Sequence, residues 1–117
     1  MKVEEFASLL FDIESVSHVA HLQTKKFSDH MALNDLYGGI VDLRDRFIET
    51  YQGKYGIIKG YELESDPEIE IKAYLKETVG DIEKYREELK DGYLQQIVDD
   101  VIELIYGTLY KLNTLTQ

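Results

Sequence analysis

The chain has 117 residues, the size of one domain with one core, and its hydrophobic fraction of 44% excludes a disordered chain. It has no cysteine, which excludes disulfides and thiolate metal sites and favours a cytoplasmic protein. Its net charge of -10 disfavours binding to DNA and to anionic membranes, and no apolar run is long enough to span a bilayer. We therefore expect a single domain over residues 1–117.

Two helices are predicted in the first half of the chain. Helical spacing of apolar residues predicts the first over about residues 2–24. Its apolar face comprises Phe6, Leu9, Leu10, Ile13, Ser17 and Ala20. Ser28 or Asp29 is a suitable N-cap for the second, which we expect to end near Gly53. Its apolar face comprises Leu33, Leu36, Tyr37, Ile40, Phe47, Ile48 and Tyr51.

The sequence of the second half of the chain predicts two more helices. The run Ser65-Asp66-Pro67-Glu68 combines capping-box spacing with a proline near the first helical position, which indicates a helix start. Asp91-Gly92 interrupts the pattern and separates the third helix from the fourth. We find no alternation typical of β-strands and no internal repeat.

Four amphipathic helices of similar length predict an all-α four-helix bundle made of two antiparallel hairpins. The first two helices and the last two are joined by short connections. About a dozen residues join the second helix to the third, and they could extend roughly 40 Å. This segment could cross the length of the bundle, as in a ferritin-like four-helix bundle, or form a slack loop in an up-down-up-down bundle, and the sequence leaves both open.

A polar stripe on the second helix carries side chains that suit a metal ion. His30, Asn34, Asp45 and Glu49 follow one another at helical spacing, and His18 and His21 precede them on the first helix. Imidazoles and carboxylates are ligands for iron, zinc or manganese. His30 and Asp45 are separated by about 22 Å along one helix, so they could share an ion only across two antiparallel copies. The stripe therefore predicts a dimer if it binds metal.

This stripe, H-x3-N-x10-D-x3-E, resembles the ferroxidase helix of the starvation-induced DNA-protection ferritins (Dps proteins), and His21 corresponds to the histidine that ends their first helix. The resemblance covers just under half the chain and extends to small ferritin-like proteins of phages. It implies an iron site in which His21, His30 and Asn34 face Asp45 and Glu49 of the partner subunit. Asn34 stands where that family has a carboxylate, which gives a weaker ligand. The chain lacks the family's basic tail, which argues against DNA binding.

The predicted function is Fe(II) binding and oxidation at this intersubunit site, with zinc or manganese as alternative ions. We expect a homodimer or a larger homo-oligomer built through the first two helices. Gly38 and Gly39 would allow two copies of the second helix to approach closely. Phe11 and Leu22 lie off the core face of the first helix and would add an exposed apolar strip to that contact.

Two other functions fit the same composition. Acidic residues on the third and fourth helices, among them Glu83, Glu87, Glu88, Asp99, Asp100 and Glu103, suit a magnesium-dependent nucleotide pyrophosphohydrolase. The net charge equally suits a non-enzymatic acidic module that binds a basic protein, or a ferritin-like protein that has lost its chemistry.

Overall fold

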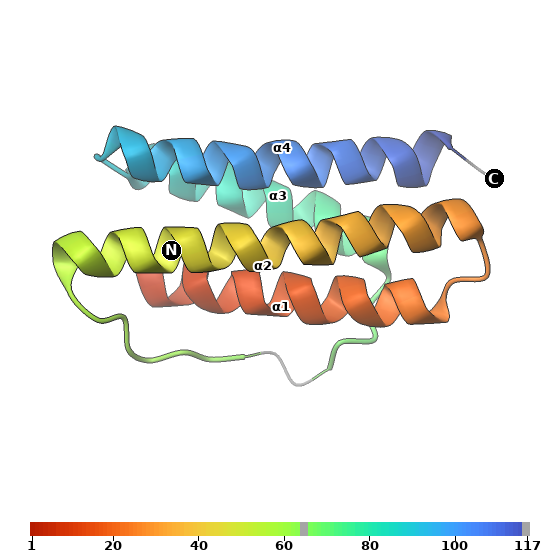
Figure 1. The fold of residues 1–117 in the computed structure, drawn as a ribbon, viewed down its shortest axis with the longest axis horizontal. Helices are drawn as coiled ribbons and strands as arrows, with labels where there is room; N and C mark the ends of the chain where they lie inside the picture. The colour runs from red at the N-terminus through yellow and green to blue at the C-terminus, as the bar shows by residue number, and fades with distance from the viewer. Residues whose placement is uncertain (64–65, 116–117) are drawn as a thin grey trace.

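The computed structural model describes residues 1–63 and 66–115, and these form a bundle of four helices (Figure 1). The helices are α1 (Val3–Gln23), α2 (Phe27–Tyr55), α3 (Ile71–Glu88) and α4 (Gly92–Thr114). The described residues contain no β-strand, and their helices are all too short or too polar to cross a membrane. The predicted all-α bundle of two antiparallel hairpins, α1–α2 and α3–α4, is confirmed.

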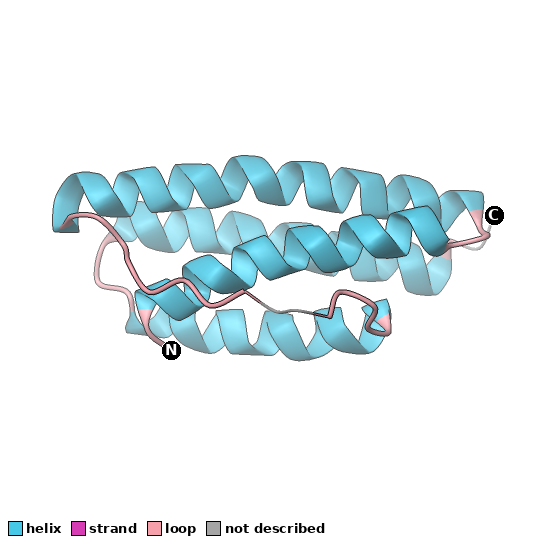
Figure 2. Ribbon diagram, turned by 90° about the horizontal axis from the view of Figure 1, so that it is seen from below, coloured by secondary structure: helices cyan, strands magenta, loops and turns pink. Residues whose placement is uncertain are grey.

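The connection between α2 and α3, which we call the crossover, runs along the length of the bundle. It leaves α2 at one end, passes along the outside of α1 and enters α3 at the other end (Figures 1 and 2). As a result α2 packs antiparallel to α4, and α1 packs antiparallel to α3. A bundle with one long crossover is one of the known connectivities of four-helix proteins.

Two predicted helix starts are wrong. α2 begins at Phe27, before Ser28, whose hydroxyl donates instead to the Leu115 carbonyl oxygen at 3.2 Å. α3 begins at Ile71, later than predicted, because the Glu70 carboxylate accepts hydrogen bonds from the first free backbone N–H groups of the helix. Ser65, the predicted cap, lies outside the described residues.

Aromatic rings fill the centre of the core. The Phe6 ring lies 4.8 Å from the Phe47 ring and 4.6 Å from the Tyr85 ring, which joins α1, α2 and α3. Each buried ring of this size stabilises the fold by about 1.5–3 kcal/mol. Burial also raises the pKa of the Tyr85 phenol.

The two central glycines of α2 differ in their surroundings. A Cβ atom on Gly39 would lie 2.8 Å from Leu104 Cδ2 of α4, whereas a Cβ atom on Gly38 would meet nothing within 4 Å. Gly39 therefore lies at a close approach between α2 and α4 within one chain, and the expected close approach of two copies of α2 stays a prediction.

The crossover is fastened to α1. The backbone N–H of Glu62 donates to Ser8 Oγ at 2.9 Å, and the Tyr61 ring meets the Phe11 ring edge-on, with centroids 5.7 Å apart. The guanidinium of Arg44 lies over the Phe11 ring, 4.1 Å from the ring centroid. Phe11 is therefore half-covered within the chain, and our expectation that it lies on an exposed strip is wrong. Leu22 is exposed as expected.

Candidate functional site

The structure brings His21 and His30 together where α1 ends and α2 begins. Their rings stack with centroids 3.7 Å apart and planes inclined by 20°. His21 Nδ1 lies 2.6 Å from the carbonyl oxygen of His30, and His30 Nδ1 lies 2.9 Å from the carbonyl oxygen of His21. A carbonyl oxygen only accepts, so both Nδ1 atoms donate, which leaves Nε2 of each ring as the nitrogen that can carry a lone pair. We call this reciprocal arrangement the histidine clasp.

The clasp has a structural role at the end of α1. The last carbonyl groups of a helix have no partner within that helix and carry partial negative charge. His21 is close to the end of α1, and the ring of His30 supplies a donor for its carbonyl oxygen. His21 itself is buried, with 7% of its surface exposed. Its hydrogen bond to the His30 carbonyl oxygen in α2 therefore gives a buried imidazole N–H a partner that it would otherwise lack.

Asn34 and Asp45 of the predicted metal site have hydrogen-bond partners outside the clasp, and His18, the third histidine, also lies outside it. His18 is exposed and stacks on Tyr37 with ring centroids 4.0 Å apart, and Tyr37 Oη donates to Asn34 Oδ1 at 3.1 Å. The carboxylate of Asp45 accepts from Arg44 Nε at 3.0 Å. Glu49 is exposed and lies on the turn of α2 beyond Asp45.

Within one chain, therefore, His21 and His30 meet, whereas Asp45 and Glu49 lie further along α2, with about 22 Å between His30 and Asp45. The described part of the chain has no group of three or more His, Asp or Glu side chains placed to hold one metal ion. A meeting of all five residues across two copies stays a prediction.

Three acidic residues of α3 and α4 accept hydrogen bonds from neighbouring side chains. Asp99 accepts from Arg86 Nε at 2.9 Å and from Arg86 Nη2 at 3.2 Å, and Asp100 accepts from Arg46 Nη1 at 3.4 Å. Glu83 accepts from Tyr106 Oη at 2.8 Å. These contacts neutralise or occupy part of the carboxylate cluster that we considered for magnesium.

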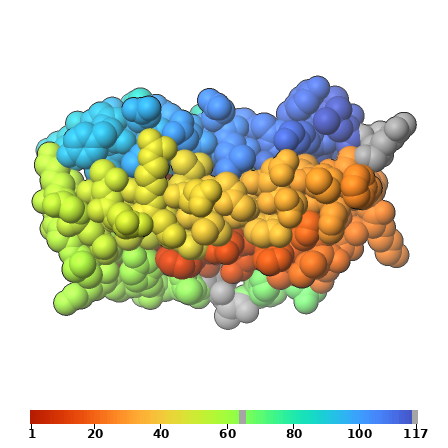
Figure 3. Space-filling model, viewed as in Figure 1, coloured from red at the N-terminus to blue at the C-terminus, as the bar shows by residue number. Residues whose placement is uncertain are grey.

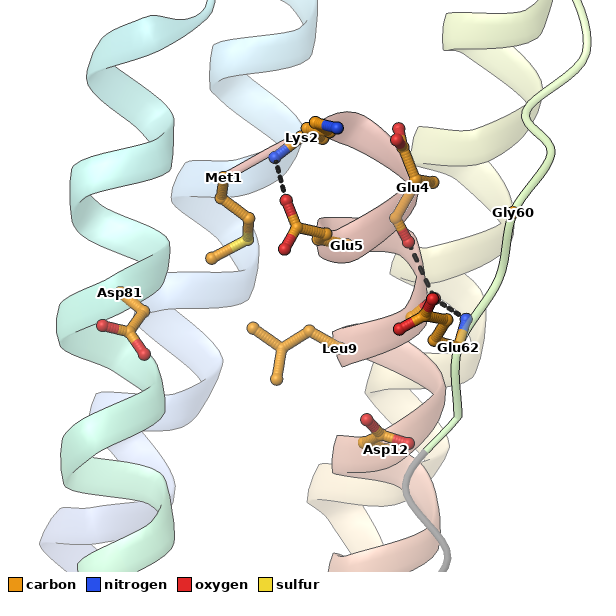
Figure 4. Close-up of a pocket in the computed structure, with 10 residues that line it drawn as sticks. Met1, Lys2, Glu4, Glu5, Leu9, Asp12, Gly60, Glu62 and Asp81 are labelled. Atoms are coloured by element: carbon orange, nitrogen blue, oxygen red, sulfur yellow. Dashed lines mark hydrogen bonds between the residues drawn. The ribbon is translucent and has the colours of Figure 1, made fainter.

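A second feature, which the sequence analysis missed, is an open hollow beside α1. It has a volume of about 640 Å³ and lies between α1 and α3, with the crossover at its edge (Figure 4). Its lining contains the carboxylates of Glu4, Glu5, Asp12, Glu62 and Asp81. Lys2 is the one basic side chain in the lining as far as the structure describes it, and Met1 and Leu9 add apolar surface. We call this region the acidic hollow.

Local hydrogen bonds set the shape of the acidic hollow. The Lys2 backbone N–H donates to Glu5 Oε1 at 2.8 Å and so orders the first turn of α1. Ser8 Oγ donates to the Glu4 carbonyl oxygen at 2.7 Å while it accepts from Glu62 N–H, which brings the crossover carboxylate beside α1. Asp81 lies on α3 across the hollow, with Leu9 between it and Glu62 (Figure 4).

No single stretch of sequence signals the acidic hollow, because its carboxylates come from three separate segments. Acidic residues are common in the first turn of any helix, because they interact favourably with the helix dipole. Glu4 and Glu5 in the first turn of α1 therefore gave no indication of a shared surface. The path of the crossover places Glu62 there, and that path was left open by the sequence.

The fold and these two features define a small acidic four-helix protein with one crossover. The chain belongs to the family described as DUF5856, a family of unknown function, whose model matches residues 21–112. It is also similar to an uncharacterized 14.6 kDa protein in the mobD-ri intergenic region of Enterobacteria phage T4. The two are 27% identical over 119 residues, which cover 96% of this chain and 88% of the phage protein. No solved structure matches the chain.

The resemblance to Dps proteins is wrong, because the chain belongs to this other family and neither match points to a ferritin. The spacing that suggested it has a simpler physical origin. Any long amphipathic helix places polar residues at intervals of three, four and seven on the border of its core face. In this chain His30 closes the histidine clasp, and Asp45 pairs with the neighbouring Arg44.

Proposed function

We propose that this protein is a non-enzymatic, cytoplasmic binding module whose acidic hollow takes up a basic, partly apolar segment of a partner protein. The observation that carries this proposal is the convergence of five carboxylates from α1, the crossover and α3 on one open concave surface. The whole chain carries 23 acidic and 13 basic residues, so its field also attracts basic partners from a distance.

The lining of the acidic hollow indicates the chemistry of the partner. Lysine and arginine side chains would place their charged ends near Glu4, Glu62 and Asp81. Leu9 lies between α1 and α3 in the same hollow and offers an apolar contact for the alkyl part of such a side chain or for a neighbouring apolar residue. Charge pairing of this kind mainly accelerates association and provides specificity, and it weakens as salt is added.

Calorimetric titration with a short peptide of repeated Lys-Lys-Phe tests this function. We expect saturable binding that weakens as salt rises, and a loss of about tenfold or more in affinity for Glu4→Gln/Asp81→Asn, which corresponds to about 1.4 kcal/mol. Asp42→Asn/Glu49→Gln removes the same charge from exposed positions of α2 and should change affinity less than threefold. Equal losses for the two double variants would show that only net charge matters and would contradict a site in the acidic hollow.

Metal binding is a second candidate, favoured by the state of the histidine clasp. Metal-ligating histidines commonly donate Nδ1–H to a carbonyl oxygen and coordinate through Nε2, which is the tautomer that the hydrogen bonds of His21 and His30 select. Zinc suits imidazole, and iron or manganese would use additional carboxylates. Titration with Zn(II), and with Fe(II) without oxygen, tests it. Binding that disappears in His30→Ala supports this candidate, and unchanged binding in that variant contradicts it.

A further inference from the structure

The end of the bundle where α1 turns into α2 differs in character from the rest of the surface. Lys25 and Lys26 lie exposed in the turn, between Leu22 and Phe27. Leu22 is 69% exposed and Phe27 is 71% exposed, so two large apolar side chains stand in solvent beside two lysines. Large apolar side chains exposed together commonly mark a contact surface for another protein.

The last residues of α4 extend this surface. Phe27, Met31 and Leu115 line a shallow groove of about 280 Å³ between the start of α2 and the end of α4. Lys111 and Asp35 also line it, and because Lys111 Nζ lies 3.8 Å from Asp35 Oδ2 this pair adds no net charge, so the positive charge of the surface comes from Lys25 and Lys26. We call Leu22, Lys25, Lys26, Phe27, Met31 and Leu115 the basic tip. It lies at the end of the molecule where α1 and α4 finish (Figures 1 and 3).

We propose that the basic tip of one molecule docks in the acidic hollow of a second copy. This inference rests on the proposed function and names the basic segment as residues 25–27 of the same protein. The two surfaces are complementary: two lysines beside an exposed phenylalanine on one, and five carboxylates beside Leu9 on the other. In this contact the lysines would lie near carboxylates, and the apolar side chain of Phe27 would lie near Leu9.

The positions of the two surfaces determine the geometry of this contact. The acidic hollow lies beside the first half of α1, from Glu4 to Asp12, and the basic tip lies at the other end of this helix, roughly 15–30 Å further along its axis. A surface at one end that binds a different surface at the other gives a heterologous contact. Successive copies would join head to tail. The two-fold dimer that we expected from α1 and α2 would instead use the same surface twice.

The strength of the contact follows from its size and from the total charge. The basic tip is small, and two copies of net charge -10 repel each other at long range. Small interfaces of this kind form transient complexes. We therefore expect association that depends on concentration and appears near physiological salt, where the long-range repulsion is screened within about 8 Å.

Sedimentation equilibrium over a series of concentrations tests the proposal. The wild-type protein should show a mass that rises above 13.6 kDa with concentration. Lys25→Glu/Lys26→Glu, which alters only the basic tip, and Glu4→Lys/Asp81→Lys, which alters only the acidic hollow, should each remain monomeric. An equal mixture of the two variants retains one intact tip and one intact hollow. It should form a two-copy complex and grow no further.

Matched variants separate this contact from a general effect of charge. Lys84→Glu/Lys90→Glu makes the same change in charge at exposed positions away from the tip and should associate like the wild type. Phe27→Ser should weaken association, whereas Ile57→Ser, at an equally exposed position outside the tip, should not. Far-ultraviolet circular dichroism confirms that each variant is folded.

The outcomes distinguish this inference from the proposed function. A wild-type protein that stays monomeric at all concentrations overturns the head-to-tail contact, as does a mixture of the two variants that stays monomeric. If the Lys-Lys-Phe peptide still binds the acidic hollow in that case, the proposed function stands with a different partner. If the peptide fails as well, both proposals fall.

Discussion

His21 and His30 each donate a hydrogen bond from Nδ1 to the backbone carbonyl oxygen of the other, and their rings stack. This reciprocal bond joins the last turn of α1 to the first turn of α2. It also explains why histidines stand at both positions, because an imidazole combines a flat stacking surface with a donor that reaches a nearby backbone. His21 and His30, two of the five predicted metal ligands, thus have a structural role at the helix junction, and metal binding by them stays a prediction.

The histidine clasp predicts non-additive stability. His21→Ala and His30→Ala should each lower the free energy of unfolding by about 1–3 kcal/mol, since each leaves a polar backbone group without its partner. The double variant should lose about 1 kcal/mol less than the sum of the two, because either change breaks the shared contact. Urea unfolding measures all three. Additive losses would show that the rings do not act together. His18→Ala, at an exposed position, should cost about 0.5 kcal/mol.

Arg44 should matter more for stability than Arg46. The Arg44 side chain is buried, contacts the carboxylates of Glu14 and Asp45, and lies over the Phe11 ring. Arg44→Ala should therefore cost about 1–3 kcal/mol through lost packing and through Glu14, which loses its partner. Arg46 makes one exposed ion pair, so Arg46→Ala should cost less than about 1 kcal/mol. Comparison of urea midpoints checks this order, and a larger loss at Arg46 would contradict it.

The neighbouring glycines of α2 should respond oppositely to alanine. Gly38→Ala should stabilise the protein by about 0.5–1 kcal/mol, because alanine favours the helix and its Cβ meets open space. Gly39→Ala should lack this gain, because its Cβ would overlap Leu104 Cδ2. Thermal unfolding measures both. Leu104→Ala provides the control: in that background Gly39→Ala should become favourable, and a persistent penalty would contradict the proposed overlap.

Asp91 should contribute to the pH dependence of stability. Its carboxylate accepts from Lys54 Nζ at 2.7 Å and from the Tyr55 hydroxyl, and these hydrogen bonds, Lys54 first, lower its pKa. A carboxylate with a lowered pKa in the folded state stabilises the protein above its unfolded pKa, and this contribution is lost as pH falls through the folded pKa.

Asp91→Asn should therefore weaken the loss of stability on acidification below about pH 4, the usual range of an aspartate. Urea unfolding from neutral pH downward measures it. Asp42→Asn, at an exposed position of α2, is the control and should leave the acid dependence close to that of the wild type. Identical acid dependence in Asp91→Asn and the wild type would show that Asp91 has no part in it.

Much of the fold could be predicted from apolar spacing alone. Phe6, Leu10 and Ile13 were placed on the core face of the first helix, and all three are fully buried. Helical periodicity carries this information because it reports which face of each helix lies inward. The start of α3 was predicted too early because Pro67 and the preceding cap pattern satisfy local rules, while Glu70 makes the actual cap.

The site was less accessible to prediction, because it depends on contacts between segments. The sequence indicated that His21 and His30 are close to a helix junction, but the direction of their Nδ1 atoms follows from how α1 and α2 pack. Glu62 and Asp81 belong to segments whose placement depends on the crossover path. Helical spacing alone made Asp45 resemble a metal ligand, whereas its contact is with Arg44.

Chemical-shift mapping of the whole protein with the Lys-Lys-Phe peptide, near physiological salt, tests the central claim most directly. We expect saturable shifts centred on Glu4, Leu9, Glu62 and Asp81, which belong to three different segments, with little change at Asp42 and Glu49. Shifts spread evenly over all acidic faces, or no shifts at any peptide concentration, would contradict an acidic hollow that binds a basic segment.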